Sequence, residues 1–255
     1  MSNEEMLSIL INAYACSPNM GSEPGMAWNW CINLARHCEL YIITEGEFRD
    51  KIEAALPTLP QGKHMHFYYN PVSEEIRKMC WNQGDWRFYK HYKKWQWKTY
   101  EMAQEIIVKQ HIDIVHQLNM IGFREPGYLW KIDKPFVWGP VDAKEKFPTA
   151  YLRDAGIKAN LFIRLKNHIT GLQLRYSQRV KKAVKKASVV ISASSESQKS
   201  FKKYFHIDAP LLNETGCYPK TTIINSTKEK GDLNLLWVGK LDFRKQLSLA
   251  IKAIA

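Results

Sequence analysis

The sequence has 255 residues, enough for one large domain or two small ones with a hydrophobic core. Hydrophobic residues make up 45% and charged residues 24%, as in ordinary globular proteins, which excludes general disorder and a coiled coil. The 37 Lys and Arg residues outnumber the 25 Asp and Glu residues, and the resulting net charge of +12 predicts attraction to phosphorylated ligands, anionic lipid or nucleic acid.

Several features indicate a cytoplasmic protein. The apolar runs fall far short of the ~18 residues that a membrane-spanning helix needs. The N-terminus carries Glu4 and Glu5 where a secretory signal has Lys or Arg. The five cysteines are scattered, with neither the pairing of a disulfide framework nor the spacing of a zinc site, which fits a reducing compartment.

Apolar runs alternate with helical patterns along most of the chain. Such runs, separated by helices, are typical of a parallel sheet covered on both faces, so we predict an α/β, Rossmann-like fold. The predicted helices cover residues 26–37, 48–56 and 194–205, and the predicted strands cover residues 7–13, 40–44, 64–69, 112–118, 136–138 and 189–193.

Two basic stretches interrupt this alternation. The stretch from Arg77 to Tyr100 has seven Lys or Arg against one acid and is rich in Trp and Tyr. The stretch from Arg153 to Lys186 has ten Lys or Arg against one acid, and its apolar residues recur in steps of three and four. Those steps predict one long helix with an apolar stripe and a basic opposite face. A solvated basic face over an aromatic core is one interpretation, and contact with an anionic membrane surface is the other.

The last part of the chain predicts the start of a second domain. We assign residues 1–220 to the first domain and the polar residues 221–232 to a linker. Residues 233–238 predict a new strand, 239–246 a loop and 247–255 a helix. A strand–helix–strand unit takes roughly 30 residues or more, so we expect these residues to be only the beginning of that domain.

The first candidate ligand site is the G-S-E-P-G loop that follows the first predicted strand. Gly21 and Gly25 let a ligand approach the backbone, and the helix that follows offers free N–H groups to a phosphate or a sugar oxygen. Open parallel sheets bind ligands beyond the carboxyl ends of their strands. The loop lacks the G-x-G-x-x-G pattern of dinucleotide-binding proteins, and a plain tight turn is the alternative.

Other candidates follow later strands. His116 is expected near the end of the fourth strand, with Asn119 behind it, where an imidazole can hydrogen-bond a substrate hydroxyl. Trp138 and Gly139 end the fifth strand, and the Trp ring either stacks on a sugar or belongs to the core. Lys240 and Lys245 flank the loop after the strand of the second domain, where they either clamp a diphosphate or face solvent.

Together, the order of G-S-E-P-G, D-I-V-H-Q, W-G-P-V and G-K-L-D-F-R-K resembles bacterial family 4 glycosyltransferases. These are retaining enzymes that use nucleotide-sugar donors and have two Rossmann-like domains, the GT-B architecture. The resemblance implies that Gly21, Ser22 and Gly25 lie against the donor diphosphate and the acceptor, and that His116 faces the transferred sugar. It also implies that Lys240 and Lys245 hold the diphosphate.

The sequence departs from this family at several positions of its motifs. Leu118 stands at a usual second His, Lys240 at a usual Arg, and Gln246 at a usual Gly. Asp142 and Ala143 follow W-G-P-V where many relatives have two glycines. A Lys cannot form the bidentate fork of an Arg. The resemblance places the family's acidic pair and most nucleotide contacts in the C-terminal domain, beyond these residues, so we expect the chain to be inactive alone.

The function that the resemblance implies is sugar transfer from a nucleotide-diphosphate sugar to a glycan or lipid-linked acceptor in cell-surface polysaccharide or lipopolysaccharide synthesis. We expect no cofactor and no metal, because cations and helix N-termini can take the place of Mg²⁺. We also expect a peripheral position at the inner face of the membrane, through the two basic stretches. The alternatives are a nucleic-acid-binding module, which we do not expect, and a nucleotide-binding Rossmann protein without transfer chemistry.

Overall fold

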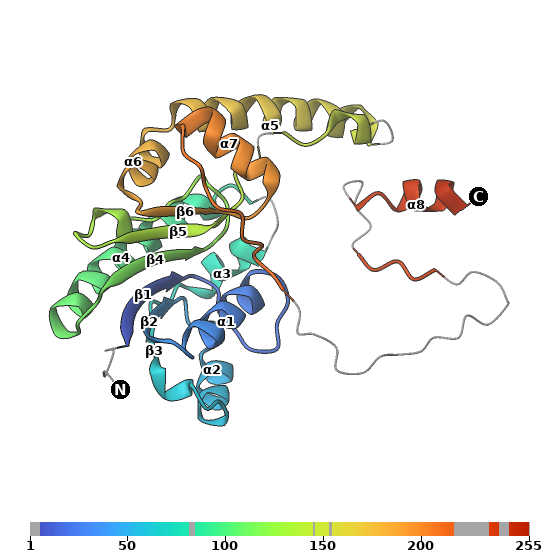
Figure 1. The fold of residues 1–255 in the computed structure, drawn as a ribbon. Helices are drawn as coiled ribbons and strands as arrows, with labels where there is room; N and C mark the ends of the chain where they lie inside the picture. Colours follow the sequence, from blue (N-terminus) through green and yellow to red (C-terminus); the bar gives the residue numbers. More distant parts are fainter. Residues whose placement is uncertain are drawn as a thin grey trace. The chain divides into compact units, whose positions relative to one another are not determined.

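The computed structural model describes residues 6–81, 85–144, 146–152, 155–216, 235–239 and 245–254. Its described residues contain a sheet of six strands, all parallel, in the order β3-β2-β1-β4-β5-β6 (Figure 1). The predicted α/β, Rossmann-like class is therefore confirmed. The strands are β1 (Leu7–Ala13), β2 (Cys38–Thr44), β3 (Met65–Tyr69), β4 (Ile114–Asn119), β5 (Phe136–Val141) and β6 (Val189–Ser192).

Helices cover both faces of the sheet, which is why its central strands are apolar throughout. In β1, Leu10 and Ile11 point to opposite faces, and both are fully buried. Ile11 belongs to the core under α1 (Ser22–Leu34) and α2 (Arg49–Ala55). Leu10 belongs to the core under the helices of the other face, which are α4 (Phe88–Lys109), α6 (Gln178–Lys186) and α7 (Ser195–Phe205).

The basic stretch that begins at Arg153 differs from its prediction. It forms two helices, α5 (Gly156–Tyr176) and α6, because the chain leaves the helical conformation at Ser177. Ser177 caps α6, and its side chain accepts the Val180 N–H. The apolar stripe divides accordingly: Val180 and Val184 are buried in α6, whereas the stripe residues of α5 are exposed.

The chain forms two compact units, one made of residues 1–144 and 173–215 and the other of residues 145–172 and 216–255. The first unit contains the sheet. In the second, α8 (Leu247–Ile254) lies where a helix was predicted, and Gln246 Nε2 donates to Tyr151 O at 3.2 Å. Residues 235–238, the described part of the last predicted strand, form no strand, and the linker 221–232 lies outside the described residues. No helix of the described residues could span a bilayer.

Candidate functional site

The strand order creates a switch point between β1 and β4, the central pair of the sheet. From β1 the chain winds outward to β2 and β3, whereas β4 is followed outward by β5 and β6 (Figure 1). The loops after two such strands diverge to opposite faces and leave room for a ligand at the carboxyl edge. The loop between β1 and α1 and the loop after β4 both begin at this point, so the candidate residues Gly21, Ser22, Gly25 and Asn119 belong to one region.

Asn119 joins these two loops. Its side chain is fully buried, and Nδ2 donates to Ala15 O at 2.8 Å and to Glu23 O at 3.4 Å. Asn119 therefore holds the loop after β1 and the start of α1 against the loop after β4. Asn119 Oδ1 is also buried, and it accepts no hydrogen bond from any described residue.

The two glycines of the loop differ in their surroundings. A Cβ on Gly25 would lie 1.8 Å from Met20 O, so the fold itself requires a glycine at this position. Gly21 precedes α1 in an extended conformation, and a Cβ there would meet nothing within 4 Å. Ser22 begins α1 with a φ of 57°. The tight-turn interpretation thus accounts for Gly25, whereas nothing in the fold explains Gly21.

Glu23 is a residue of this site that the sequence analysis did not single out. Its Oε1 accepts the Ile121 N–H at 3.2 Å, which links α1 to the loop after β4. Its Oε2 is buried and accepts no hydrogen bond from the described residues. Burial raises the pKa of this carboxyl to about 7, and Glu214 nearby adds to the effect, against the Ile121 hydrogen bond, which lowers it. A first-turn acid is ordinarily exposed, so only the tertiary fold shows that this carboxyl is buried.

His116 lies in the middle of β4 and not near its end. Its register partners are Ile11 on β1 and Val137 on β5, and β4 continues to Asn119. The imidazole is buried, and Nε2 lies 2.7 Å from Gly139 O, so Nε2 carries the proton and donates it to that carbonyl. Burial lowers the pKa of His116 to about 4, and the ring is neutral at pH 7. The imidazole also lies edge-on to the ring of Trp30 in α1, with the two ring centroids 6.0 Å apart.

Trp138 and Gly139 serve the packing of the sheet. The Trp138 ring is 2% exposed and packs edge-on against Phe201 of α7, so the core interpretation holds and stacking on a sugar does not fit. Gly139 has a φ of 138°, and a Cβ there would lie 2.5 Å from Ile191 O in β6. Asp142, directly after β5, is joined to the loop after β4, because its N–H donates to Ile121 O at 2.7 Å.

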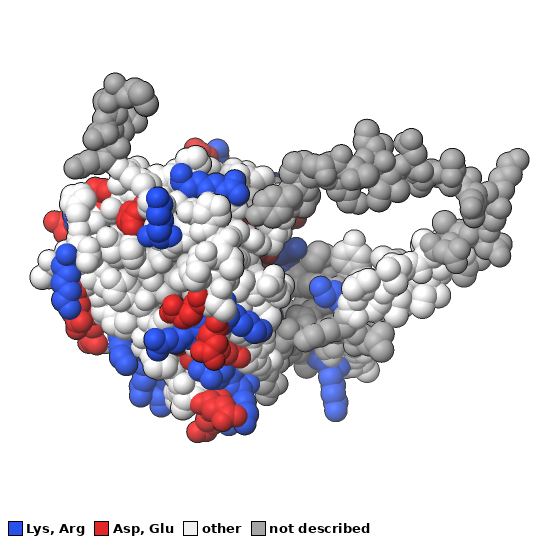
Figure 2. Space-filling view, turned by 90° about the horizontal axis from the view of Figure 1, so that it is seen from below, with Lys and Arg blue, Asp and Glu red and all other residues white. Residues whose placement is uncertain are grey.

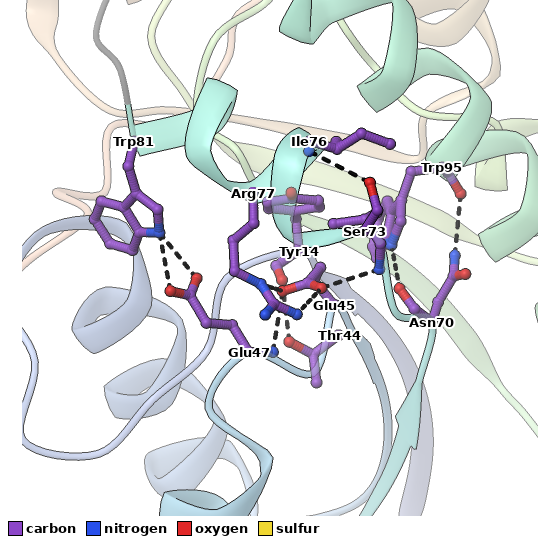
Figure 3. A network of polar contacts seen from close by, with 11 residues as sticks. Tyr14, Thr44, Glu45, Glu47, Asn70, Ser73, Ile76, Arg77, Trp81 and Trp95 are labelled. Carbon is purple, nitrogen blue, oxygen red and sulfur yellow. Dashed lines mark hydrogen bonds and ion pairs between the residues drawn. The ribbon is translucent and has the colours of Figure 1, made fainter.

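The carboxyl end of β2 carries a second polar cluster, shown in Figure 3. Glu45 directly follows β2 and is 3% exposed. Its Oε1 accepts from Val72 N and Arg77 Nη2, and its Oε2 accepts from Glu47 N and Arg77 Nε. Arg77 belongs to α3 (Glu74–Trp81), so this ion pair fixes α3 to the sheet. All four hydrogen bonds are internal to the protein.

The aromatic residues of the stretch from Arg77 to Tyr100 divide between core and surface. Phe88, Tyr92 and Trp95 of α4 are buried around Tyr14 of the first loop. Others are exposed, and two of them bind acids: the Trp81 indole donates to Glu47, and the Trp97 indole donates to Glu101. The exposed aromatic residues are Trp81, Trp86, Tyr89 and Trp97.

The two predicted diphosphate-binding lysines do not belong to the unit that carries the sheet. Lys245 is exposed, directly before Gln246 and α8, and Lys240 lies outside the described residues. Within the parts of the chain that the structure describes, no group of three or more His, Cys, Asp or Glu side chains could hold a metal ion. Neither a family model nor a curated protein matches the sequence.

Proposed function

We propose that the sheet is the acceptor-side domain of a retaining glycosyltransferase, which moves a sugar from a nucleotide-diphosphate sugar to a glycan or lipid-linked acceptor in cell-surface polysaccharide or lipopolysaccharide synthesis. The proposal begins from the resemblance in the motifs. The strand order supports it, because open parallel sheets with such a switch point bind nucleotides and sugars beyond the carboxyl ends of their strands.

One observation carries the proposal: two buried oxygens at the switch point accept no hydrogen bond from the described residues. They are Glu23 Oε2 and Asn119 Oδ1, on the two loops that meet there. Buried polar atoms are almost always paired, so such oxygens favour a ligand that donates hydrogen bonds. A sugar hydroxyl can donate to Asn119 Oδ1 and can either donate to Glu23 or accept from it, since this carboxyl carries a proton below its pKa of about 7. Phosphate oxygens offer no donor to Asn119 Oδ1, so we assign this part of the loop to the acceptor sugar and not to the diphosphate.

The runner-up, a dinucleotide-binding protein, is less well supported. Dinucleotide-binding sheets use a carboxylate after β2 to accept the ribose hydroxyls. Here that position is held by Glu45, and Arg77 together with two backbone N–H groups already occupies both of its oxygens. A ribose would have to displace a buried ion pair, which is costly.

In the proposed reaction the negative charge that grows on the leaving diphosphate is stabilised by fixed positive groups. The resemblance assigns these positive groups to Lys240 and Lys245. Gly21 leaves the backbone open to the ligand. The neutral imidazole of His116 hydrogen-bonds Gly139 O of β5, and its ring packs against Trp30 of α1. We therefore propose that His116 positions α1 relative to the sheet. We propose that the reaction needs no metal.

Ligand binding to the 255-residue chain tests this function. Saturation-transfer NMR should show contact with the sugar protons of nucleotide sugars and of short glycans, and none with NAD or a single-stranded oligonucleotide. The variant Gly21→Asn keeps a residue that favours the start of a helix and adds a side chain where the fold leaves space. We expect it to weaken sugar binding at least ten-fold and to leave the melting temperature nearly unchanged.

Val108→Ser is the matched control, because Val108 is 87% exposed and far from the proposed site. It lies near the end of α4, which leads into the amino end of β4, whereas the site is at the carboxyl end. It should bind sugars as the wild type does. Binding of NAD alone would move the assignment to the runner-up. Binding of the oligonucleotide at physiological salt would move it to a nucleic-acid-binding module. Sugar binding that Gly21→Asn leaves unchanged would remove the ligand from this loop.

A further inference from the structure

The helix α5 presents an apolar face that no described residue covers. Its large apolar side chains recur in steps of three and four, which places them along one side of a helix. Single exposed apolar residues need no explanation, but a contiguous row marks an interaction surface. The exposed fractions are 89% for Ile157, 69% for Leu161, 63% for Phe162, 56% for Leu165, 42% for Ile169, 44% for Leu172 and 59% for Tyr176.

The opposite side of α5 is the side that the fold buries. Ile163 and Thr170 are each 4% exposed, and Leu174 is fully buried in the main core. These three residues lie roughly 140–180° around the helix from Leu165, at 3.6 residues per turn. The helix therefore already has a buried side, and the exposed apolar face is additional to it.

The positive charge of the protein is concentrated on the same segment. Residues 155–195 contain nine Lys and Arg residues and no acid, whereas the rest of the chain has 28 Lys and Arg against 25 Asp and Glu. On the face of the molecule that Figure 2 shows, blue and red side chains are interspersed. Along α5, Arg164 and Lys166 lie about 100° to either side of Leu165, so cations flank the apolar face on both edges.

We propose that α5 docks on an anionic lipid bilayer, with its apolar face in the interfacial region and its flanking cations at the lipid phosphates. Helices that lie in a membrane interface have this pattern: an apolar face, Lys and Arg beside it, and no need to span the bilayer. The long side chains of Lys and Arg can extend toward the headgroups while their stems cover apolar surface. The proposal does not depend on the enzymatic function.

The structure favours α5 over the stretch from Arg77 to Tyr100 for this contact. The exposed indoles of Trp81 and Trp97 donate hydrogen bonds to Glu47 and Glu101, and these carboxylates would be repelled by an anionic surface. The exposed face of α5 has no acid at all, because the helix contains none. Of the two basic stretches, the one that contains α5 combines a long exposed apolar face with a helix that contains no acid.

Vesicle sedimentation with the full 255-residue chain tests the proposal. Phosphatidylcholine vesicles with 30% phosphatidylglycerol, the probe composition, should bind the chain at least ten-fold more tightly than phosphatidylcholine alone in low salt. The double variant Leu161→Ser/Leu165→Ser should bind at least ten-fold more weakly. Removing three cations with Lys158→Gln/Arg164→Gln/Arg175→Gln should weaken binding on the order of 100-fold, since each cation contributes roughly five-fold at an anionic surface.

The matched control Trp86→Ser/Val108→Ser removes two apolar side chains, 79% and 87% exposed, from outside α5 and should change binding less than two-fold. Hydrogen exchange of the wild type on vesicles is a second measurement that needs no variant, and it should slow within residues 156–176. Equal binding to both kinds of vesicle, or α5 variants that bind like the control, would overturn the proposal. A dimer in solution that Leu161→Ser/Leu165→Ser dissociates, without vesicle binding, would assign the face to a second copy.

Discussion

Arg77 binds both carboxylate oxygens of Glu45, with Nη2 2.7 Å from Oε1 and Nε 3.2 Å from Oε2 (Figure 3). The carboxylate is almost fully buried, and the guanidinium is partly exposed. A charge in this position is tolerated only with its partner, because desolvation of an unpaired carboxylate is expensive. The pair therefore connects β2 to α3 in a way that depends on both residues.

We predict that Arg77→Met lowers the free energy of unfolding by about 3–5 kcal/mol, because it leaves the Glu45 carboxylate buried and unpaired. Urea denaturation at pH 7 measures the change. The double variant Glu45→Gln/Arg77→Met should recover a large part of the loss. Lys78→Met is the control: its partner Glu74 is equally exposed, so its removal should have no measurable effect. Equal losses for Arg77→Met and Lys78→Met would contradict the prediction.

The stability of the protein should fall with rising pH because of Glu23. The pKa of this carboxyl is about 7 in the folded state and near 4.5 when unfolded, so between these values only the folded state keeps the proton. The stabilisation that Glu23 contributes to the folded state is therefore fully present below pH 4.5 and is lost as the pH rises through 7. Relative to Glu23→Gln, the wild type should lose on the order of 2 kcal/mol between pH 5 and 8. Urea titrations at several pH values give this difference, and a constant difference would show that Glu23 ionises normally.

His116 predicts the opposite dependence on pH. Its pKa is about 4 in the folded state and near 6.5 when unfolded, so acid protonates the unfolded chain first. Its contribution is present above pH 6.5 and is lost as the pH falls toward 4. Relative to His116→Gln, which can still donate to Gly139 O, the wild type should lose on the order of 2 kcal/mol between pH 7 and 5. The same urea titrations apply, and a wild type that tracks His116→Gln at every pH would refute a buried neutral imidazole.

The two glycines of the first loop should respond differently to alanine. Gly25→Ala should lower the free energy of unfolding by at least about 2 kcal/mol, since its Cβ would meet Met20 O at 1.8 Å and that atom belongs to the backbone. Gly21→Ala meets nothing within 4 Å and should cost less than about 1 kcal/mol. Thermal unfolding of the two variants under identical conditions gives the comparison. Equal destabilisation would mean that the loop is not held as the structure has it.

The sheet could be predicted from the sequence because each of its strands is a local apolar run. The run from Leu7 to Ala13 needs no knowledge of its neighbours to indicate a buried strand. Strand order is different, since it depends on how the helices pack and no local pattern of residues encodes it. The carboxyl-edge location of the first loop followed from the parallel arrangement alone.

The site itself was less accessible to prediction because its chemistry depends on burial. His116 was expected at a strand end, yet it lies in mid-strand, where alternation turns its ring toward α1. Glu23 looks like an ordinary first-turn acid until the loop after β4 covers it. In α5 the periodicity gave the apolar stripe correctly, but periodicity does not tell which of two apolar faces meets the core.

Trp30 connects the end of the sheet domain to the candidate site. Its indole donates to Glu214 O at 2.9 Å, while its ring lies beside His116. Glu214 lies near the end of the sheet domain, so one side chain of α1 contacts both this end and the residues proposed to hold a sugar. A ligand that shifts α1 would therefore also shift the backbone at Glu214.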